Sequence, residues 1–257
     1  MVLLVAHRGF KVGVPENTFR AFSLAVARHV DYIELDARLS ADGEAFVLHD
    51  ASLQRTMNAN ARLAELTAAE VDALNAKLGD SGIPRVTDVL RFIGKARAGG
   101  GGVRLMIELK GAGTGAVVAK LVLEEHLEDA VAFSGHDLNE LVVAHENAPR
   151  VPACLNITSC KEYTRRQLER APGRASLPMP LAMASIKASM ASREYIRACH
   201  HLGMLALAWD FERARRPLDV LARMVHDGLD GVLVDDPAML EPAREVFDEA
   251  RDVRAGA

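Results

Sequence analysis

Short apolar segments alternate with longer amphipathic segments along almost all of the 257 residues, and this alternation most constrains the fold. The apolar segments have the length of buried strands, whereas the amphipathic segments have the 3.6-residue periodicity of helices. Strands that alternate with helices in this way indicate βαβ units and a parallel sheet. The expected strands are Leu3–His7, Tyr32–Leu39, Ala45–His49, Leu105–Lys110, Ala130–Ser134, Ala153–Ile157, Leu181–Ile186, Leu205–Trp209 and Gly231–Asp235.

Helical periodicity fills most of the intervals between these strands. The expected helices are Thr18–His29, Thr67–Ala76, Val86–Ala96, Gly115–His126, Leu138–Asn147, Arg193–Leu202, Leu218–Asp227 and Met239–Arg251. The chain is close to the ~250 residues of a single (β/α)₈ barrel, and its composition shows no break. We therefore predict one domain that spans residues 1–257.

The number of expected strands is one more than an eight-stranded barrel requires. Only Ser40–Glu44 separates the second expected strand from the third, whereas a parallel crossover takes a dozen or more residues. The pair Asp42-Gly43 is typical of a two-residue hairpin turn. We predict an α/β fold, a (β/α)₈ TIM-type barrel with a short antiparallel β-hairpin after strand 2. A short helical insertion is expected before strand 3.

The register of this hairpin affects the chemistry that we expect. With Asp42-Gly43 as the loop, Ala41 faces Glu44. Continuing the same register places Asp36 opposite His49. The hairpin is thus expected to bring a histidine back beside a carboxylate.

Two expected barrel strands carry charged residues on one face. In Ile33–Asp36 the strand alternation directs both carboxylates away from the two apolar side chains, and Ile107–Lys110 repeats this arrangement with a carboxylate and an ammonium. Polar residues at the C-terminal ends of barrel strands usually belong to the active site, because apolar layers fill the barrel below them. The alternative is a structural network of ion pairs.

The carboxylates of Glu34, Asp36 and Glu108 carry more negative charge than Lys110 can offset. A hard divalent cation with oxygen ligands relieves such repulsion. No cysteine cluster or histidine triad has the spacing of a zinc site, so the sequence favours Mg²⁺ or Ca²⁺.

Two histidines are expected at the same barrel mouth. His7 ends the first expected strand and His49 ends the hairpin. A pair of histidines beside a metal site suits general acid–base catalysis near neutral pH. Arg8 and Lys110 add fixed positive charge, which suits an anionic phosphate and its transition state.

Several short motifs occur in order along the chain. They are His7-Arg8-Gly9, Pro15–Thr18, Ile33–Asp36, Asp42-Gly43, His49-Asp50 with Leu53 to Thr56, and Ile107–Lys110. Together they resemble the signature of the glycerophosphodiester phosphodiesterases, and the resemblance resumes at Asp230–Pro237. It implies a metal-dependent enzyme that hydrolyses glycerophosphodiesters to glycerol 3-phosphate and an alcohol. Water or the glycerol 2-hydroxyl can serve as the nucleophile.

The resemblance also implies roles for individual residues. Its metal ligands are Glu34, Asp36 and Glu108, and its acid–base pair is His7 and His49, without saying which of the two is the acid. The groups that it assigns to the phosphoryl group or to the rest of the substrate are Arg8, Glu16, Lys110 and Trp209. Glu16 has an alternative role as a favourable charge at a helix N-terminus, and Trp209 as a core residue.

Some positions depart from the family pattern. The family often has W-T-V-N where this chain has Trp209–Glu212, and Asp210 places an acid where a hydroxyl is usual. His136 and Lys187 are weaker candidates for the site, with a loop histidine and a surface lysine as the alternatives. Asp235 is expected to stabilise a loop.

Charge and cysteine content limit the partners and the compartment. The net charge of -4 comes without a long run of like charges, which argues against nucleic acid or a membrane as a partner. Three cysteines without disulfide spacing, and an N-terminus unlike a signal peptide, favour a cytoplasmic enzyme with a small-molecule substrate. A homo-oligomer stays open. The alternative functions are a related phospholipase D or lysophospholipase D type of barrel enzyme, and a non-catalytic barrel that binds phosphodiesters.

Overall fold

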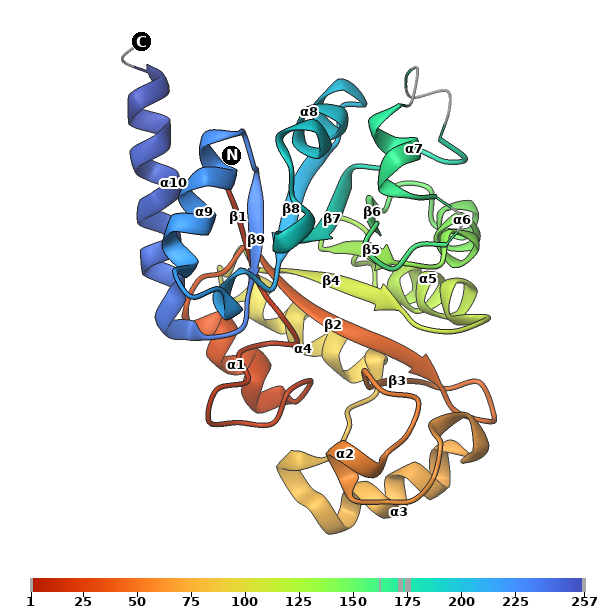
Figure 1. Ribbon diagram of the computed structural model, residues 1–257. Helices are drawn as coiled ribbons and strands as arrows, with labels where there is room; N and C mark the ends of the chain where they lie inside the picture. The colour runs from red at the N-terminus through yellow and green to blue at the C-terminus, as the bar shows by residue number, and fades with distance from the viewer. Residues whose placement is uncertain (1, 162, 171–172, 174–176, 256–257) are drawn as a thin grey trace.

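The computed structural model describes residues 2–161, 163–170, 173 and 177–255, which form a closed barrel of parallel strands (Figure 1). The strand order is β1-β9-β8-β7-β6-β5-β4-β2, and β1 closes the barrel by pairing with β2. The barrel strands are β1 (Leu3–Ala6), β2 (Tyr32–Leu39), β4 (Arg104–Leu109), β5 (Val131–Gly135), β6 (Ala153–Asn156), β7 (Met183–Lys187), β8 (Leu205–Trp209) and β9 (Gly231–Val234). The predicted TIM-type barrel is thus confirmed.

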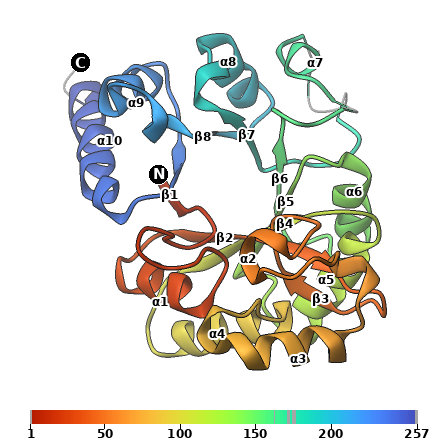
Figure 2. The same cartoon turned by 60° about the horizontal axis from the view of Figure 1, so that its bottom comes forward.

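Helices surround the strands (Figure 2). The longer ones are α1 (Phe19–Ala27), α4 (Val86–Ala98), α5 (Thr114–Glu124), α6 (Leu138–Asn147), α8 (Arg193–His201), α9 (Pro217–His226) and α10 (Leu240–Ala255). The insertion before β4 contains α2 (Gln54–Met57), η1 (Leu63–Glu65), α3 (Ala68–Leu78) and η2 (Gly79–Ser81). The remaining short elements are α7 (Arg165–Glu169), η4 (Ala188–Met190), η5 (Phe211–Arg213) and η6 (Pro237–Met239).

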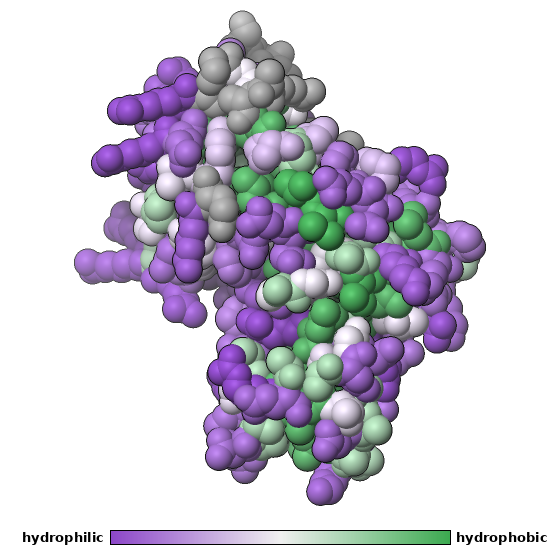
Figure 3. Space-filling view, turned by 90° about the vertical axis from the view of Figure 1, so that its right-hand side faces the viewer, coloured by the Kyte–Doolittle hydropathy of each residue, from purple (hydrophilic) through white to green (hydrophobic). Residues whose placement is uncertain are grey.

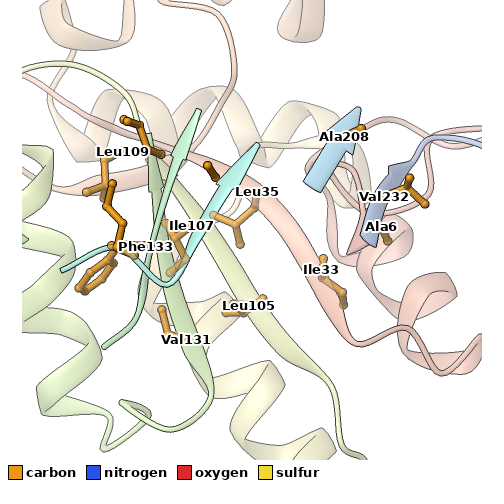
Figure 4. Close-up of a cluster of buried hydrophobic side chains, with 14 of the residues drawn as sticks. Ala6, Ile33, Leu35, Leu105, Ile107, Leu109, Val131, Phe133, Ala208 and Val232 are labelled. Atoms are coloured by element: carbon orange, nitrogen blue, oxygen red, sulfur yellow. The ribbon is translucent and has the colours of Figure 1, made fainter. Parts of the chain in front are cut away.

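Strand alternation sorts the apolar residues into two layers. The outward residues of the strands, such as Ile33, Leu35 and Ile107, pack against the helices (Figure 4). The inward residues form a separate cluster that fills the barrel. Its members are Leu3, Val5, Tyr32, Met106, Ala132, Cys154, Met183, Leu207 and Leu233. The charged residues farther along the same inward faces therefore lie above an apolar floor.

The predicted hairpin is present, but its predicted register is wrong by one residue. β3 (Ala45–Val47) pairs antiparallel with β2, and Leu39 lies opposite Ala45. The N–H of Ser40 donates to the carbonyl of Glu44 at 2.9 Å, so the loop has three residues and not two. Gly43 has a φ of +85°, as the last residue of a common three-residue hairpin loop requires. Asp36 consequently lies opposite Leu48, whose N–H donates to the Asp36 carbonyl.

The turn of the hairpin is tied to the insertion. The carboxylate of Asp42 accepts the N–H of Ala68 at the start of α3, and the N–H of Ala41 donates to the carbonyl of Leu66. Thr67 adds a capping box with Glu70. These contacts couple the loop conformation to a segment more than 20 residues away, which explains why the local Asp42-Gly43 signal was an incomplete guide.

The surface is mainly polar. On the face shown in Figure 3, hydrophilic side chains flank a band of hydrophobic ones. The large hydrophobic side chains with the highest exposure come from several separate elements. They are Val12, Phe19, Leu24, Leu123, Met190 and Leu218. Among the described helices, none combines the length and the apolar character that a membrane crossing needs.

Candidate active site

Three carboxylates meet at the C-terminal end of the barrel strands. Glu34 and Asp36 come from β2 and Glu108 from β4, and the strand register pairs Asp36 with Glu108. One oxygen from each residue lies within 4.8 Å of the other two. Their relative exposures are 3%, 0% and 8%, respectively, so water contributes little to their solvation. The carboxylates that the sequence assigned to a metal are thus brought together.

Two cations partly neutralise this cluster. The Nζ of Lys110 lies 3.2 Å from Asp36 and 3.0 Å from Glu108. The backbone N–H of Arg8 donates to Glu34 at 2.8 Å, and its Nε lies 3.4 Å from Asp36. The three carboxyl groups outnumber these two cations. A bound divalent cation would therefore favour the ionised form of all three.

The protonation of the carboxylates reflects this crowding. Burial, and then the nearby Asp36 and Glu108, raise the pKa of Glu34 well above its usual range. Burial has the same effect on Glu108, but the hydrogen bond with His136 and the ammonium of Lys110 outweigh it. They lower the pKa of Glu108 to about 2. Burial and the charges of the other two carboxylates thus oppose the ionisation of Glu34.

The turn after β1 is shaped to reach the carboxylates. Arg8 and Asn17 both have a φ of +58°, and Asn17 donates its amide to Asp36 at 2.9 Å. Gly9 has a φ of +68°, and a Cβ at that position would lie 2.8 Å from Ala21. Glycine is required there by conformation and by space. Sequence reasoning did not identify Asn17, although it lies within the Pro15–Thr18 motif.

His7 is held by a carboxylate from the last barrel strand. Its Nδ1 lies 2.7 Å from Asp235, which also pairs with Lys11 at 2.8 Å. A carboxylate at Nδ1 favours the tautomer with its proton there and leaves Nε2 for the substrate. This Nε2 lies 3.9 Å from Glu34. The loop role expected for Asp235 is therefore incomplete, since its carboxylate also contacts His7.

His49 has a matching arrangement within the same cavity. Its Nδ1 lies 2.7 Å from Asp50, and Asp50 in turn accepts from Arg55 at 2.5 Å. Burial lowers the pKa of His49, Asp36 and the hydrogen bond with Asp50 oppose this, and the charges of Lys110 and Arg8 add to the lowering. His49 lines the same cavity as His7, so it reaches the site despite the changed hairpin register.

Glu16 connects two parts of the mouth. One of its oxygens accepts from Arg8 at 3.0 Å and from Arg55 at 2.6 Å. Burial raises the pKa of Glu16, but these two arginines outweigh it and lower the pKa overall. Glu16 thus ties the loop after β1 to the insertion, which supports its predicted place beside the site.

A cavity of about 250 Å³ lies next to the carboxylates. Trp209 forms part of its wall, and within the described part of the chain Trp209 Nε1 and Asn156 Oδ1 are buried and have no hydrogen-bond partner. The hydroxyl groups of Ser134 and Ser185 line the same space. Such orphaned polar atoms suit a ligand that carries hydroxyl groups. Asn156 and the serines gave no motif signal in the sequence.

Comparison with known proteins identifies the family. The model of the glycerophosphoryl diester phosphodiesterase family matches residues 7–239. The chain belongs to this family. A glycerophosphodiester phosphodiesterase of Caldanaerobacter subterraneus subsp. tengcongensis is 28% identical over 249 residues, which cover 93% of this chain and 96% of that protein.

Two solved structures share the fold of this family member. A glycerophosphodiester phosphodiesterase from Agrobacterium tumefaciens has a TM-score of 0.71 at 23% identity and covers 97% of this chain and 100% of its own. A phosphodiesterase of Oleispira antarctica, in complex with the product sn-glycerol-3-phosphate, has a TM-score of 0.73 at 22% identity. That alignment covers 95% of this chain and 96% of the other.

Asp210 and Glu212, which depart from the family pattern, each make specific polar contacts. Asp210 has a φ of +66° and pairs with Lys187 at 3.1 Å and Arg213 at 2.8 Å. Glu212 accepts the N–H groups of Asp235 and Asp236 at 2.7 and 3.1 Å. Burial raises the pKa of Glu212 to about 7, against the effect of these two donors. Glu212 therefore holds the loop that carries the partner of His7.

Proposed function

We propose that this phosphoric diester hydrolase cleaves glycerophosphodiesters to glycerol 3-phosphate and an alcohol, with the help of a divalent cation. One observation carries the proposal. His7 and His49, each backed by a carboxylate at Nδ1, line the same cavity as Glu34 and Glu108 in a member of this family. Phosphodiester hydrolysis needs such a combination of acid, base and charge neutralisation.

The carboxylate cluster fits a hard cation. Its three ligand atoms are oxygens within 4.8 Å of one another, and its three carboxyl groups outnumber the two cations, Arg8 and Lys110. Oxygen-only ligands suit Mg²⁺ or Ca²⁺. Held by Glu34, Asp36 and Glu108, the cation would neutralise charge on the phosphoryl oxygens. Arg8 and Lys110 would bind those oxygens as well.

The two histidines would move the protons. One takes a proton from the attacking water, whose oxygen forms a new bond to phosphorus. The bond from phosphorus to the alcohol oxygen breaks, and the other histidine protonates that oxygen. If the glycerol 2-hydroxyl attacks instead, water must then open the resulting cyclic phosphate to give glycerol 3-phosphate. Asp235 and Asp50 hold Nδ1 of His7 and His49, so each ring presents Nε2 to the substrate.

The orphaned polar atoms beside the cluster suit the glycerol part of the substrate. Trp209 Nε1 can donate to a glycerol hydroxyl and Asn156 Oδ1 can accept from one. Ser134 and Ser185 complete a small, polar wall. This arrangement favours a glycerophosphodiester over a long-chain lipid, and it argues against the phospholipase D alternative.

We also propose that residues 1–257 act as one barrel domain on a small-molecule substrate, and that the compartment is the cytoplasm. Burial raises the pKa of the thiols of Cys154 and Cys199 to about 12, as expected for unreactive core thiols. Such thiols suit a reducing compartment.

A substrate panel tests the function. Purified protein is incubated with glycerophosphodiesters of ethanolamine, choline, serine and glycerol, and glycerol 3-phosphate is measured. We expect release of glycerol 3-phosphate that stops with EDTA and returns with Mg²⁺ or Ca²⁺. Full activity after exhaustive chelation would exclude the metal. Binding without any turnover would favour a non-catalytic barrel.

A further inference from the structure

Arg38 is a cation that the acid–base mechanism leaves unused. It lies on β2 two residues beyond Asp36, so strand alternation directs both side chains to the same face. Lys110 follows Glu108 on β4 with the same spacing, and its N–H donates to the carbonyl of Ala37 at 3.0 Å. A cation therefore follows each of the carboxylates of Asp36 and Glu108 at a spacing of two residues. In Figure 1, β2 runs out toward β3 at this end of the barrel.

The guanidinium of Arg38 is only partly paired. Its Nε donates to the carbonyl of His49 at 2.8 Å, and its Nη1 approaches Gly111, where a Cβ would lie 3.9 Å away. In the part of the chain that the structure describes, Arg38 makes no ion pair within 4.0 Å. The residue itself is half-buried. An anionic ligand would offset the cost of this half-buried charge.

Arg62 contributes a second guanidinium from the insertion. Its side chain is 62% exposed, and the ion pair recorded for it, with Glu65, is long at 3.9 Å. Arg38 and Arg62 line one cavity, so their like charges repel each other. An anion between them would relieve this repulsion.

The space that they share is a cavity of about 400 Å³. The β2–β3 hairpin, η1 and the loop after β4 enclose it, and Ser40 and Thr114 add hydroxyl groups. Among the described residues, its lining includes no aspartate or glutamate. Lys110 lines both this cavity and the active-site cavity, so the two spaces are adjacent.

A neighbouring cavity on the other side of His49 offers a contrast. It measures about 390 Å³ and also contains cations, namely Lys11 and Arg55. There, however, Lys11 pairs with Asp235 at 2.8 Å and Arg55 pairs with Glu16 at 2.6 Å. Both cations of this cavity are therefore already neutralised by carboxylates. In the cavity between Arg38 and Arg62, by contrast, the described residues give Arg38 no ion pair within 4.0 Å, and Arg62 only the long one with Glu65 at 3.9 Å.

We propose that the cavity between Arg38 and Arg62 binds an anionic group, a carboxylate or a phosphate, on the alcohol part of the substrate. Guanidinium groups bind both anions through paired charge-assisted hydrogen bonds. The proposal rests on the proposed function and deepens it, because it names a class of glycerophosphodiesters. The preferred substrates carry a second negative charge beyond the scissile phosphate.

Glycerophosphoserine and glycerophosphoethanolamine test this directly, because they differ only by one carboxylate. Their dissociation constants are measured by calorimetry with EDTA present, so that turnover is not needed. We expect glycerophosphoserine to bind about tenfold more tightly. With the cation restored, its kcat/KM should exceed that of the ethanolamine ester by a similar factor, mainly through KM. An ester whose alcohol carries a phosphate shows whether the cavity prefers phosphate to carboxylate.

Arginine-to-glutamine variants distinguish binding in this cavity from a general effect of net charge on affinity. Arg62→Gln and Arg38→Gln should each reduce the preference for the serine ester to near unity. Arg91→Gln is the matched control, because Arg91 pairs with Glu125 on the outer helices. It should keep the wild-type preference. Since Arg38 also supports the carbonyl of His49, Arg62→Gln decides the matter if Arg38→Gln is inactive.

Two results would overturn the proposal. Equal affinity of the wild-type protein for the two esters would show that the carboxylate meets no cation. An equal loss of preference in Arg91→Gln would show that net charge alone is responsible. Both outcomes would leave hydrolysis itself intact, whereas a failure of the proposed function would appear as binding without glycerol 3-phosphate release.

Discussion

A carboxylate at Nδ1 is the shared feature of the two cavity histidines, and it favours the tautomer whose proton is on Nδ1. His7 depends on Asp235, which lies 228 residues away, whereas His49 depends on its neighbour Asp50. The arrangement resembles other acid–base sites, in which the carboxylate orients the ring and stabilises its charged form. Single substitutions of these histidines and of their carboxylate partners can therefore test the proposed catalytic roles.

Replacing His7 or His49 by alanine should lower kcat by ~10²–10⁴, the usual effect of losing a positioned acid or base. The two variants should differ between substrates. Loss of the acid matters most for an alkyl leaving group, since p-nitrophenolate departs without a proton. Loss of the base should slow both substrates. Steady-state kinetics of each variant on an alkyl and an aryl diester assign the roles, and near-normal alkyl activity in both variants would refute the mechanism.

Asp235→Asn should lower kcat by about 10–100-fold, as is typical when a supporting partner of a functional histidine is lost. The amide can present its NH₂ group to Nδ1 and so favour the wrong tautomer. KM should change little, because Asp235 supports His7 and not the substrate. The kcat–pH profile is the decisive measurement, since a purely structural loss would scale the profile without moving it. Lys11→Gln removes the other partner of Asp235 and serves as the control.

Sequence reasoning found the charged residues of the site but not all of their partners. Glu34, Asp36, Glu108 and Lys110 could be placed together because alternation along a strand is a local rule. Asp235 and Asn156 could not be placed beside these residues from the sequence, because their position at the site depends on how distant strands close the barrel. The parallel pairing of β1 with β9, with Ala6 beside Val234, is the physical fact that brings Asp235 to His7.

At the scale of elements, the loops and strand ends set the geometry of the candidate site. The hairpin shows the limit of local signals, since the Asp42-Gly43 pair predicted the turn but misplaced its register by one residue. The helices α2 and α7 were also missed, because four or five residues are too few to show a helical period. The long periodic elements were predicted within a few residues of their observed ends.

Glu212 gives the loop after β9 a pH-dependent anchor. Its pKa is about 7 in the fold, mainly because of burial, and its usual value is 4.5. The folded state thus holds this proton more tightly, so the contribution of Glu212 to stability is complete below pH 4.5. That contribution falls as pH rises through about 7. In urea unfolding, the wild type should lose stability relative to Glu212→Gln as the pH rises from 5 to 8, because glutamine does not ionise.

The comparison needs a control for surface charge. Glu241→Gln changes an exposed carboxylate on α10 and should leave the pH dependence of stability as in the wild type. A constant difference between wild type and Glu212→Gln across the pH range would contradict the prediction. It would mean that the two backbone N–H donors of Asp235 and Asp236 outweigh burial at Glu212.

At the scale of the whole molecule, the barrel assembles the carboxylate cluster from distant parts of the chain. Glu108 is 72 residues after Asp36, yet the parallel register of β2 and β4 pairs them. The unfolded chain has no such cluster, so a cation would bind the folded state almost exclusively. Binding must therefore stabilise the fold.

Calorimetric melting with Mg²⁺ or Ca²⁺ tests this coupling without measuring activity. A cation at 100 times its dissociation constant adds about 2.7 kcal/mol, which raises Tm by roughly 5–10 °C for a chain of this size. Glu34→Gln should abolish this rise. Without metal its Tm should equal or exceed that of the wild type, because the change removes one of three crowded negative charges. The amide oxygen can still accept the N–H of Arg8.

Glu34→Gln is thus expected to lose the rise in Tm with metal and yet to keep or raise its Tm without metal. A variant that is merely misfolded would have a lower Tm in both conditions. Glu44→Gln changes an exposed acid on the hairpin and should keep the full response to metal. If wild-type Tm is unchanged by either cation at millimolar concentration, the cluster does not bind it. Lys110 and Arg8 would then be its permanent counter-ions, and Glu34, Asp36 and Glu108 would form the structural ion-pair network that is the alternative to a metal site.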